Sequence, residues 1–228
     1  MDDAARRGPQ EAARAVGPRE KAPWRGRRAE PRTRGMQNDP IALFLASRAE
    51  AVAAGAAHDG VAAVLATASP DGMPSARYVL VKEVGPDGFY VYTNYGSPKS
   101  RDLDANPRAS LCIHWPETGV QFRVAGPVER ASAARSDAYF ASRPRESQLG
   151  AWASAQSTPI GSRDELMAAF AAAEARFAGG PVPRPATWGG YVLRPQRIEH
   201  WKAGDHRLHD RFLYERDGDG WRFTRLAP

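Results

Sequence analysis

Hydrophobic positions along the chain follow first a helical and then a strand-like pattern. A helix is predicted after Asp39-Pro40, because Asp is a favoured N-cap residue and proline fits the first helical turn. The apolar positions that follow recur at roughly helical spacing: Ile41, Leu43, Phe44, Ala51 and Val52. The first structured element is therefore expected close to residue 40.

Short apolar runs separated by turn residues come next and predict a set of antiparallel strands. Asp71-Gly72, Pro86-Asp87-Gly88 and residues 217–220 are breaks of the kind that join two strands in a hairpin. The predicted strands span residues 61–68, 76–84, 89–93, 109–115, 120–129, 190–193, 198–201, 212–216 and 221–225.

Helical segments are inserted between these strands. Ser97-Pro98 predicts a short helix up to residue 105, and a second helical stretch is expected from residue 132 to about residue 152. Ser162 and Glu165 have the spacing of a capping box ahead of a helix over residues 166–177. This order predicts an α+β protein built on a small antiparallel β-barrel. A Rossmann domain is disfavoured, because the chain lacks βαβ alternation and a glycine-rich nucleotide fingerprint.

Residues 1–35 differ in composition from the rest of the chain. They are rich in Arg, Ala, Pro and Gly and have almost no large apolar side chains beyond Trp24. Such a segment buries too little surface to offset its ordering entropy, so we predict a disordered basic extension followed by a folded domain over residues 36–228. Two alternatives stay open for the extension: a basic targeting or RNA-contacting tail, and translation that begins at Met36.

Charge and cysteine content narrow the class of protein. The net charge is +6, but residues 1–35 hold ten of the 32 basic and five of the 26 acidic residues, which leaves the remainder at +1. The predicted domain therefore lacks the basic footprint of a nucleic-acid binder. No segment reaches the roughly 20 apolar residues of a membrane span, and Cys112, the single cysteine, excludes an internal disulfide. A cytoplasmic protein that binds neither nucleic acid nor membrane is expected.

The densest group of chemically active side chains lies at residues 201–211, Trp-Lys-Ala-Gly-Asp-His-Arg-Leu-His-Asp-Arg. On an extended strand, period-2 alternation would place Arg207, His209 and Arg211 on one face. A row of cations is costly unless an anion or an electron-rich ring lies against it. A solvated, salt-bridged loop is the alternative, and zinc binding is disfavoured because no third nearby ligand completes a set.

A second group of cations and hydroxyls suits a phosphate ester. Arg77 and Lys82 lie on one predicted strand with opposite parity, and Lys99 follows Ser97 at a predicted helix start, where backbone N–H groups attract anions. An amphipathic strand with ordinary surface cations is the alternative.

A third group has the same character. Tyr139, Arg143 and Ser147 recur every fourth residue and share one helical face if the helix continues through Pro144. An arginine flanked by two hydroxyls again fits a phosphate, and a plain surface stripe is the alternative.

Several runs of sequence, in the same order, resemble the pyridoxamine 5′-phosphate oxidase family. They are residues 77–82, 92–99, 142–152, 188–190 and 206–214, with the terminal Arg-Leu-Ala-Pro. The resemblance covers about residue 38 to the end. It implies an FMN-binding split barrel, a homodimer with two FMN sites at its interface, and two phosphate sites, one for FMN and one for the substrate.

The resemblance also implies roles for individual residues. FMN contacts correspond to Arg77, Lys82, Tyr92, Thr93, Lys99, Gln121, Gln156, Ser157, Trp201 and Arg211. The substrate-binding residues correspond to Lys82, Tyr139, Arg143 and Ser147 for the phosphate, with the catalytic pair Arg207 and His209 at the pyridine ring and its 4′ substituent.

The implied activity is FMN-dependent oxidation of pyridoxamine or pyridoxine 5′-phosphate to pyridoxal 5′-phosphate by O2, in vitamin B6 biosynthesis and salvage. Hydride leaves the 4′ carbon for the flavin, and H2O2 is released, with ammonia from the amine. Pro98 and Val120 stand where the family usually has an arginine. Two alternatives are kept: an oxidase acting on a different ring system, and a non-catalytic flavin- or pyridoxal-phosphate-binding protein.

Overall fold

The first helix begins where the sequence predicts it. The computed structural model describes residues 39–228, so the predicted extension, residues 1–35, lies outside the described residues. Helix α1 spans Pro40–Ala53. The Asp39 carboxylate accepts hydrogen bonds from the backbone N–H groups of Ile41 (2.9 Å) and Ala42 (3.2 Å). This is the N-cap geometry expected of Asp39-Pro40.

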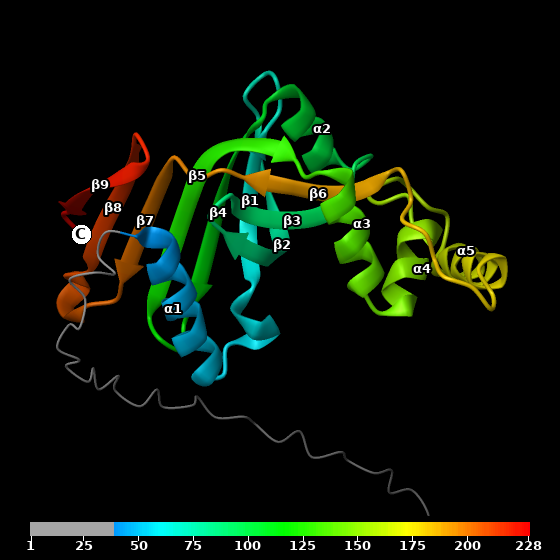
Figure 1. Cartoon of the computed structure of the whole chain (residues 1–228), viewed down its shortest axis with the longest axis horizontal. Helices are drawn as coiled ribbons and strands as arrows, with labels where there is room; N and C mark the ends of the chain where they lie inside the picture. The colour runs from blue at the N-terminus through cyan, green and yellow to red at the C-terminus, as the bar shows by residue number, and fades with distance from the viewer. Residues whose placement is uncertain (1–38) are drawn as a thin grey trace, which may run out of the picture. The chain divides into compact units, whose positions relative to one another are not determined.

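The strands of residues 39–228 close into a barrel. They are β1 (Ala62–Ala68), β2 (Pro74–Gly85), β3 (Gly88–Asn94), β4 (Arg108–Trp115), β5 (Val120–Arg130), β6 (Trp188–Leu193), β7 (Arg197–Lys202), β8 (Asp210–Asp217) and β9 (Gly220–Leu226). Antiparallel pairing runs β4-β1-β2-β3-β6-β5, and β5 pairs back to β4, which closes the ring. Strands β7, β8 and β9 continue the sheet from β5 beyond the barrel (Figure 1). The predicted small antiparallel barrel is confirmed.

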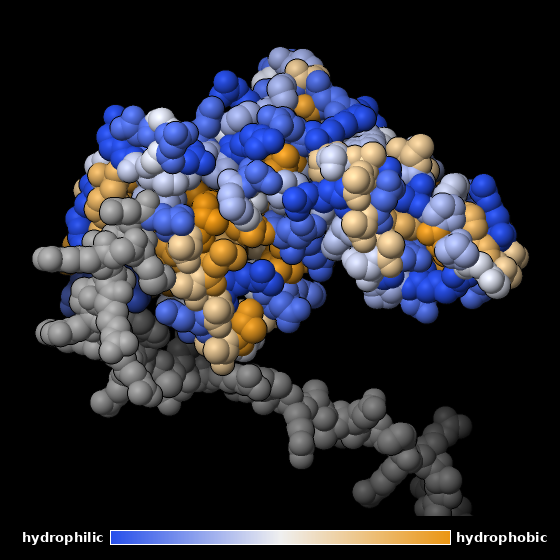
Figure 2. All heavy atoms as spheres, in the orientation of Figure 1, coloured by the Kyte–Doolittle hydropathy of each residue, from blue (hydrophilic) through white to orange (hydrophobic). Residues whose placement is uncertain are grey.

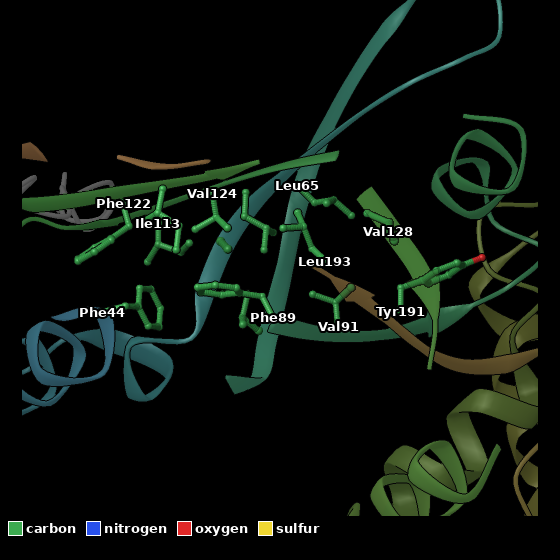
Figure 3. Packing of buried hydrophobic residues seen from close by; sticks show 14 of the residues in the cluster. Phe44, Leu65, Phe89, Val91, Ile113, Phe122, Val124, Val128, Tyr191 and Leu193 are labelled. Atoms are coloured by element: carbon green, nitrogen blue, oxygen red, sulfur yellow. The ribbon is translucent and has the colours of Figure 1, made fainter. Parts of the chain in front are cut away.

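Aromatic side chains fill the barrel beside α1. Phe44 is 1% exposed, and its ring lies 5.0 Å from that of Phe89 and 5.1 Å from that of Phe122, both edge-to-face (Figure 3). Hydrophobic residues also gather on the surface around α1 (Figure 2). Leu45, which belongs to α1, is 41% exposed. Helix α1 therefore packs its inner face onto the barrel core and leaves part of its apolar surface outside.

Strand β5 changes partners part-way along its length. Residues 120–125 pair with β7, whereas residues 128–130 pair with β6. Gly126 lies at the change, and a Cβ there would stand 2.0 Å from the carbonyl oxygen of Arg194. Only glycine permits this close approach of two backbones. One strand thus serves both the barrel and the β7–β9 extension.

The helices between the strands pack largely outside the barrel. They are α2 (Pro98–Ala105), α3 (Ala133–Ser142), α4 (Arg145–Ala153) and α5 (Arg163–Arg176), with 3-10 turns η2 (Ala57–Gly60) and η3 (Asp205–Arg207). Helices α3, α4 and α5 share a second apolar cluster with Trp188 at the start of β6. None of the helices in residues 39–228 has the length and hydrophobicity needed to cross a bilayer.

Two helix predictions need adjustment. The continuous helix predicted over residues 132–152 is wrong, because Arg143 is extended (φ −74°, ψ 149°) between α3 and α4. Pro144 causes the break, since proline disfavours helical geometry in the residue before it. Helix α5 starts at Arg163 rather than residue 166, because the Ser162 hydroxyl caps it by accepting from the Glu165 N–H (3.1 Å).

Candidate functional site

The site is centred on a cavity of about 500 Å3 between β2, β3 and the helices α2, α3 and α4. Its lining contains eight of the residues predicted from the sequence: Lys82, Tyr92, Thr93, Lys99, Tyr139, Arg143, Ser147 and Gln156. We call it the cation pocket, because its charged lining residues are Lys82, Lys99 and Arg143, and none of the described lining residues is acidic.

Lys99 supplies the first buried positive charge of the cation pocket. It lies in the first turn of α2 and is 9% exposed. Its Nζ donates to Thr93 Oγ1 (3.0 Å), Ser97 Oγ (2.9 Å) and Gln156 Oε1 (2.6 Å), all of which are neutral acceptors. Burial, helped by the nearby charge of Arg77, lowers the pKa of Lys99 to about 8. A phosphate group placed here would restore the balance of charge.

Arg143 supplies a second positive charge, on a half-buried side chain. Its guanidinium lies 4.7 Å from the ring of Trp188, and Nη1 is buried without a hydrogen-bond partner among the described residues. Burial lowers the pKa of Arg143. The break at Pro144 abolishes the predicted common helical face of Tyr139, Arg143 and Ser147, yet all three side chains still line the cation pocket. A buried donor of this kind is costly unless a ligand satisfies it.

A stack of aromatic rings forms one wall of the cation pocket. The rings of Tyr92 and Tyr139 stack at 3.8 Å, and Trp188 lies nearly parallel to Tyr92 at 5.7 Å. The Tyr92 hydroxyl donates to the carboxylate of Glu83, which also accepts from Arg135 (2.6 Å). Burial and this bond to Glu83 raise the pKa of Tyr92. The hydroxyl of Tyr92 is therefore engaged outside the lining, and its ring supports Tyr139.

A second group of predicted residues lies on strands β5, β7 and β8 and in the segment that joins β7 to β8. Gln121 pairs in register with Trp201, and Trp201 with Arg211, so the three lie in one row across adjacent strands. The ring of His209 lies 4.6 Å from that of Trp201. His209 Nδ1 accepts a hydrogen bond from the Gly204 N–H (3.2 Å), so a neutral ring carries its proton on Nε2. Together with Arg207, these residues are called the β7–β8 group.

The prediction that Arg207, His209 and Arg211 share one face of an extended strand is wrong. Strand β8 begins only at Asp210, and Arg207 ends the 3-10 turn η3. His206 and Arg207 both have positive φ values, 54° and 64°, which are uncommon for residues other than glycine. Such backbone strain persists only where the surrounding structure enforces it, and it often marks functional loops.

The cation pocket and the β7–β8 group lie apart within the chain. Figure 1 shows α3, α4 and α5 on one side of the barrel and β7, β8 and β9 on the other. No hydrogen bond or ion pair within residues 39–228 joins the two groups. Arg77 belongs with the cation pocket because its charge helps to lower the pKa of Lys99. Ser157 directly follows Gln156, a lining residue of the pocket, and has a positive φ of 68°.

Sequence reasoning missed residues that support these side chains. The sequence places Trp188 in a motif but does not indicate that its ring packs against the guanidinium of Arg143. Glu83 and Glu199 were missed because their roles depend on strand register. Glu199 faces Arg123 across β5 and β7, a pairing that the spacing of charges along the chain does not reveal.

Comparison with known proteins places the chain in a family. A family model described as pyridoxamine 5′-phosphate oxidase matches residues 49–177, and one described as the pyridoxine 5′-phosphate oxidase C-terminal dimerisation region matches residues 188–228. The pyridoxine/pyridoxamine 5′-phosphate oxidase of Rubrobacter xylanophilus is 55% identical over 194 residues, covering 85% of this chain and 89% of that protein. The protein of the same name from Anaeromyxobacter dehalogenans is 55% identical over 190 residues, covering 83% and 96%.

Solved structures agree on the fold. The crystal structure of PhzG from Burkholderia lata 383 in complex with tetrahydrophenazine-1-carboxylic acid has a TM-score of 0.78 and 34% identity, covering 83% of this chain and 92% of that chain. A pyridoxamine 5′-phosphate oxidase-related, FMN binding protein from Nostoc punctiforme has a TM-score of 0.65 at 20% identity, covering 81% and 97%. The barrel is therefore that of the FMN-binding split barrels. More narrowly, the chain belongs to the pyridoxamine 5′-phosphate oxidase family.

The unsatisfied charge of Arg143 leads to a stability prediction. Replacing it in the variant Arg143→Met should raise the stability of the ligand-free protein by about 1 kcal/mol, because a buried, unsatisfied donor costs about 1–3 kcal/mol and the cation–π contact with Trp188 offsets part of this. Urea unfolding of the ligand-free protein measures the change.

Arg145 offers a matched control for this measurement. Its guanidinium donates to the carbonyl oxygens of Gly180 (2.8 Å) and Phe177 (2.6 Å), so Arg145→Met should destabilise the protein. An Arg143→Met variant that loses as much stability as Arg145→Met would show that Arg143 is already satisfied.

Proposed function

We propose that this chain is an FMN-dependent oxidase that converts pyridoxamine 5′-phosphate and pyridoxine 5′-phosphate to pyridoxal 5′-phosphate. The observation that carries the proposal is a pair of cations in one cavity whose described lining is free of carboxylates: buried Lys99, and half-buried Arg143 with its Nη1 enclosed. Two separate cationic centres match two phosphate groups, one on the cofactor and one on the substrate. Family membership supports the same assignment.

The residues present fit an FMN phosphate beside Lys99 in the cation pocket. Lys99, Thr93 and Gln156 already form a hydrogen-bonded cluster there, and Arg77 contributes its charge from the neighbouring strand. We assign Tyr92, Lys82 and Ser157 to the same cofactor from the family resemblance. Bound FMN would supply the redox chemistry, by accepting hydride from the substrate and passing the electrons to O2.

The part of the cation pocket around Arg143 fits the substrate phosphate. Arg143 would satisfy its buried Nη1 with a phosphate oxygen, and Tyr139, Ser147 and Lys82 line the same cavity. In the reaction O2 takes two electrons and two protons from the alcohol to give aldehyde and H2O2. The amine consumes one water in addition and releases ammonia.

The β7–β8 group would complete the site from a second subunit. Arg207 and His209 are assigned to the substrate ring, and Gln121, Trp201 and Arg211 to the cofactor. Strands β7 and β8 lie on the opposite side of the barrel from α3–α5 (Figure 1), and residues 188–228 match a dimerisation region. A symmetric homodimer brings the β7–β8 group of one chain to the cation pocket of the other, once on each side of its two-fold axis. His209 would then present Nε2–H to the 4′ substituent.

Purified protein tests the proposed activity directly. We expect yellow protein whose released flavin is FMN, and stoichiometric formation of pyridoxal 5′-phosphate and H2O2 from pyridoxine 5′-phosphate. Pyridoxine without the phosphate should react poorly, because it cannot engage Arg143. Protein that stays colourless and inactive after FMN is added would refute the assignment.

A flavin oxidase with another ring substrate is the competing function. The similarity to PhzG makes a reduced phenazine carboxylic acid the appropriate comparison substrate. The clamp around Arg143 favours the phosphate ester, so specificity should be lost in Arg143→Ala. Faster oxidation of the phenazine than of pyridoxine 5′-phosphate would favour the competing function.

The lowered pKa of Lys99 predicts a pH dependence of FMN affinity. In the ligand-free protein Lys99 loses its proton near pH 8, whereas a bound phosphate would hold it protonated. The phosphate itself has a second pKa of about 6 and stays doubly charged above pH 7. The dissociation constant of FMN should therefore rise about tenfold between pH 7 and pH 9.

Fluorescence titration of flavin-free protein with FMN measures this dependence. Lys99→Met should bind FMN more weakly and lose the rise between pH 7 and pH 9. An unchanged pH profile in Lys99→Met would assign the titration to another group.

A further inference from the structure

Strands β5, β7 and β8 have one face packed on the core and one face outside it. Even-numbered residues such as Phe122, Ile198 and Tyr214 belong to the core cluster. The odd-numbered residues point the other way and include the row Gln121, Trp201 and Arg211 of the β7–β8 group. We call this the open face; beside the row it carries Arg123, Glu199 and Leu213.

Glu199 is the unusual residue of the open face. Its side chain is 6% exposed, although it lies on the face opposite the core cluster. Its Oε1 accepts from Arg211 Nε at 2.9 Å, and its Oε2 accepts from Arg123. Burial alone would raise the pKa of Glu199, but hydrogen bonds from Arg211 and Arg123 outweigh it and hold that pKa below its usual range. The carboxylate is therefore a charged bridge between two arginines.

Arg211 is held from two sides. Besides its bond to Glu199, its Nη1 donates to the backbone carbonyl oxygen of Ala227 at 2.9 Å. Two of the guanidinium's five N–H groups are thus engaged, and three have no partner among the described residues. The side chain keeps a defined orientation beside Trp201 while part of its donor edge stays available for a ligand.

We propose that Glu199 is a positioning residue that fixes Arg211 for the phosphate or ring system of FMN. The inference rests on the proposed function, which assigns Arg211 to the cofactor. A guanidinium on a flexible stem loses rotamer entropy when it binds, and the bridge to Glu199 removes that cost in advance. Glu199 also separates the like charges of Arg123 and Arg211 on one sheet face.

The sign of the effect distinguishes positioning from simple charge. If Glu199 acted only as a negative charge near an anionic cofactor, its removal would tighten FMN binding. If it positions Arg211, its removal weakens binding, because a charge-assisted hydrogen bond is lost or misaligned. Glu199→Gln keeps the size of the side chain and changes only its charge and one acceptor, so it separates the two cases.

The experiment titrates flavin-free protein with FMN, with thermal unfolding recorded alongside. Glu199→Gln should bind FMN about tenfold more weakly, the smaller end of the loss expected for one hydrogen bond to a charged group. Glu215→Gln is the matched control: Glu215 also bridges two arginines, Arg197 and Arg222, but is 33% exposed and outside the β7–β8 group. Its FMN affinity should stay within twofold of wild type.

A double-mutant cycle tests whether Glu199 acts through Arg211. In an Arg211→Met background, Glu199→Gln should cause no further loss of FMN affinity, because the side chain it positions is gone. Glu199→Asp keeps the charge but withdraws the carboxylate, and provides a second variant with weakened binding if Glu199→Gln does not fold.

Two failures are distinguishable. Wild-type protein that does not bind FMN would overturn the proposed function and this inference with it. Wild-type protein that binds FMN, with unchanged or tighter binding in Glu199→Gln or an additive loss in the Arg211→Met background, would overturn the inference alone.

Discussion

The burial of positive charge without a matching carboxylate is the constraint on which the rest of the site depends. Lys99 and Arg143 lie in one cavity, surrounded by hydroxyl, amide and aromatic groups rather than by acids. Moving a charge out of water is costly unless it is paired. The fold meets this cost with packing elsewhere, in the barrel core around Phe44 and the cluster around Trp188. A phosphate group has the charge that would balance these cations.

On the open face of β5, β7 and β8, by contrast, the arginines are paired with a carboxylate. Glu199 partners Arg211 and Arg123 there, and the Ala227 carbonyl adds a second anchor for Arg211. The described lining of the cation pocket therefore offers its cations no carboxylate, whereas on the open face hydrogen bonds to Glu199 and Ala227 orient Arg211. This difference fits the proposed arrangement, in which FMN lies between the cation pocket and the open face and its phosphate binds mainly in the cation pocket.

Much of the fold follows from local sequence signals. Asp39-Pro40 and the Asp-Gly turns predict element boundaries through capping and hairpin geometry. The structure has a helix start and hairpin turns at these positions. The break between α3 and α4 also has a local cause, because Pro144 disfavours helical geometry at Arg143. The four-residue spacing of Tyr139, Arg143 and Ser147 therefore does not correspond to one helix.

Other features depend on tertiary structure and lie beyond the sequence. His206 and Arg207 have left-handed backbone conformations, which cannot be predicted from the sequence because neither residue is a glycine. The burial of Glu199 depends on the register of three strands, and the pocket at Lys99 joins residues more than fifty positions apart in the chain, such as Lys99 and Gln156.

In the proposed homodimer, each complete site takes the cation pocket from one subunit and the β7–β8 group from the other. Subunit mixing between the variants Arg143→Ala and Arg207→Ala tests it most directly, with oxidase activity measured at low substrate concentration. Random exchange makes half of the dimers mixed, and each mixed dimer carries one site with both arginines intact, so activity should recover to about a quarter of wild type in a symmetric dimer. Activity that stays at the average of the two separate variants would contradict the claim and place both groups in one subunit's site.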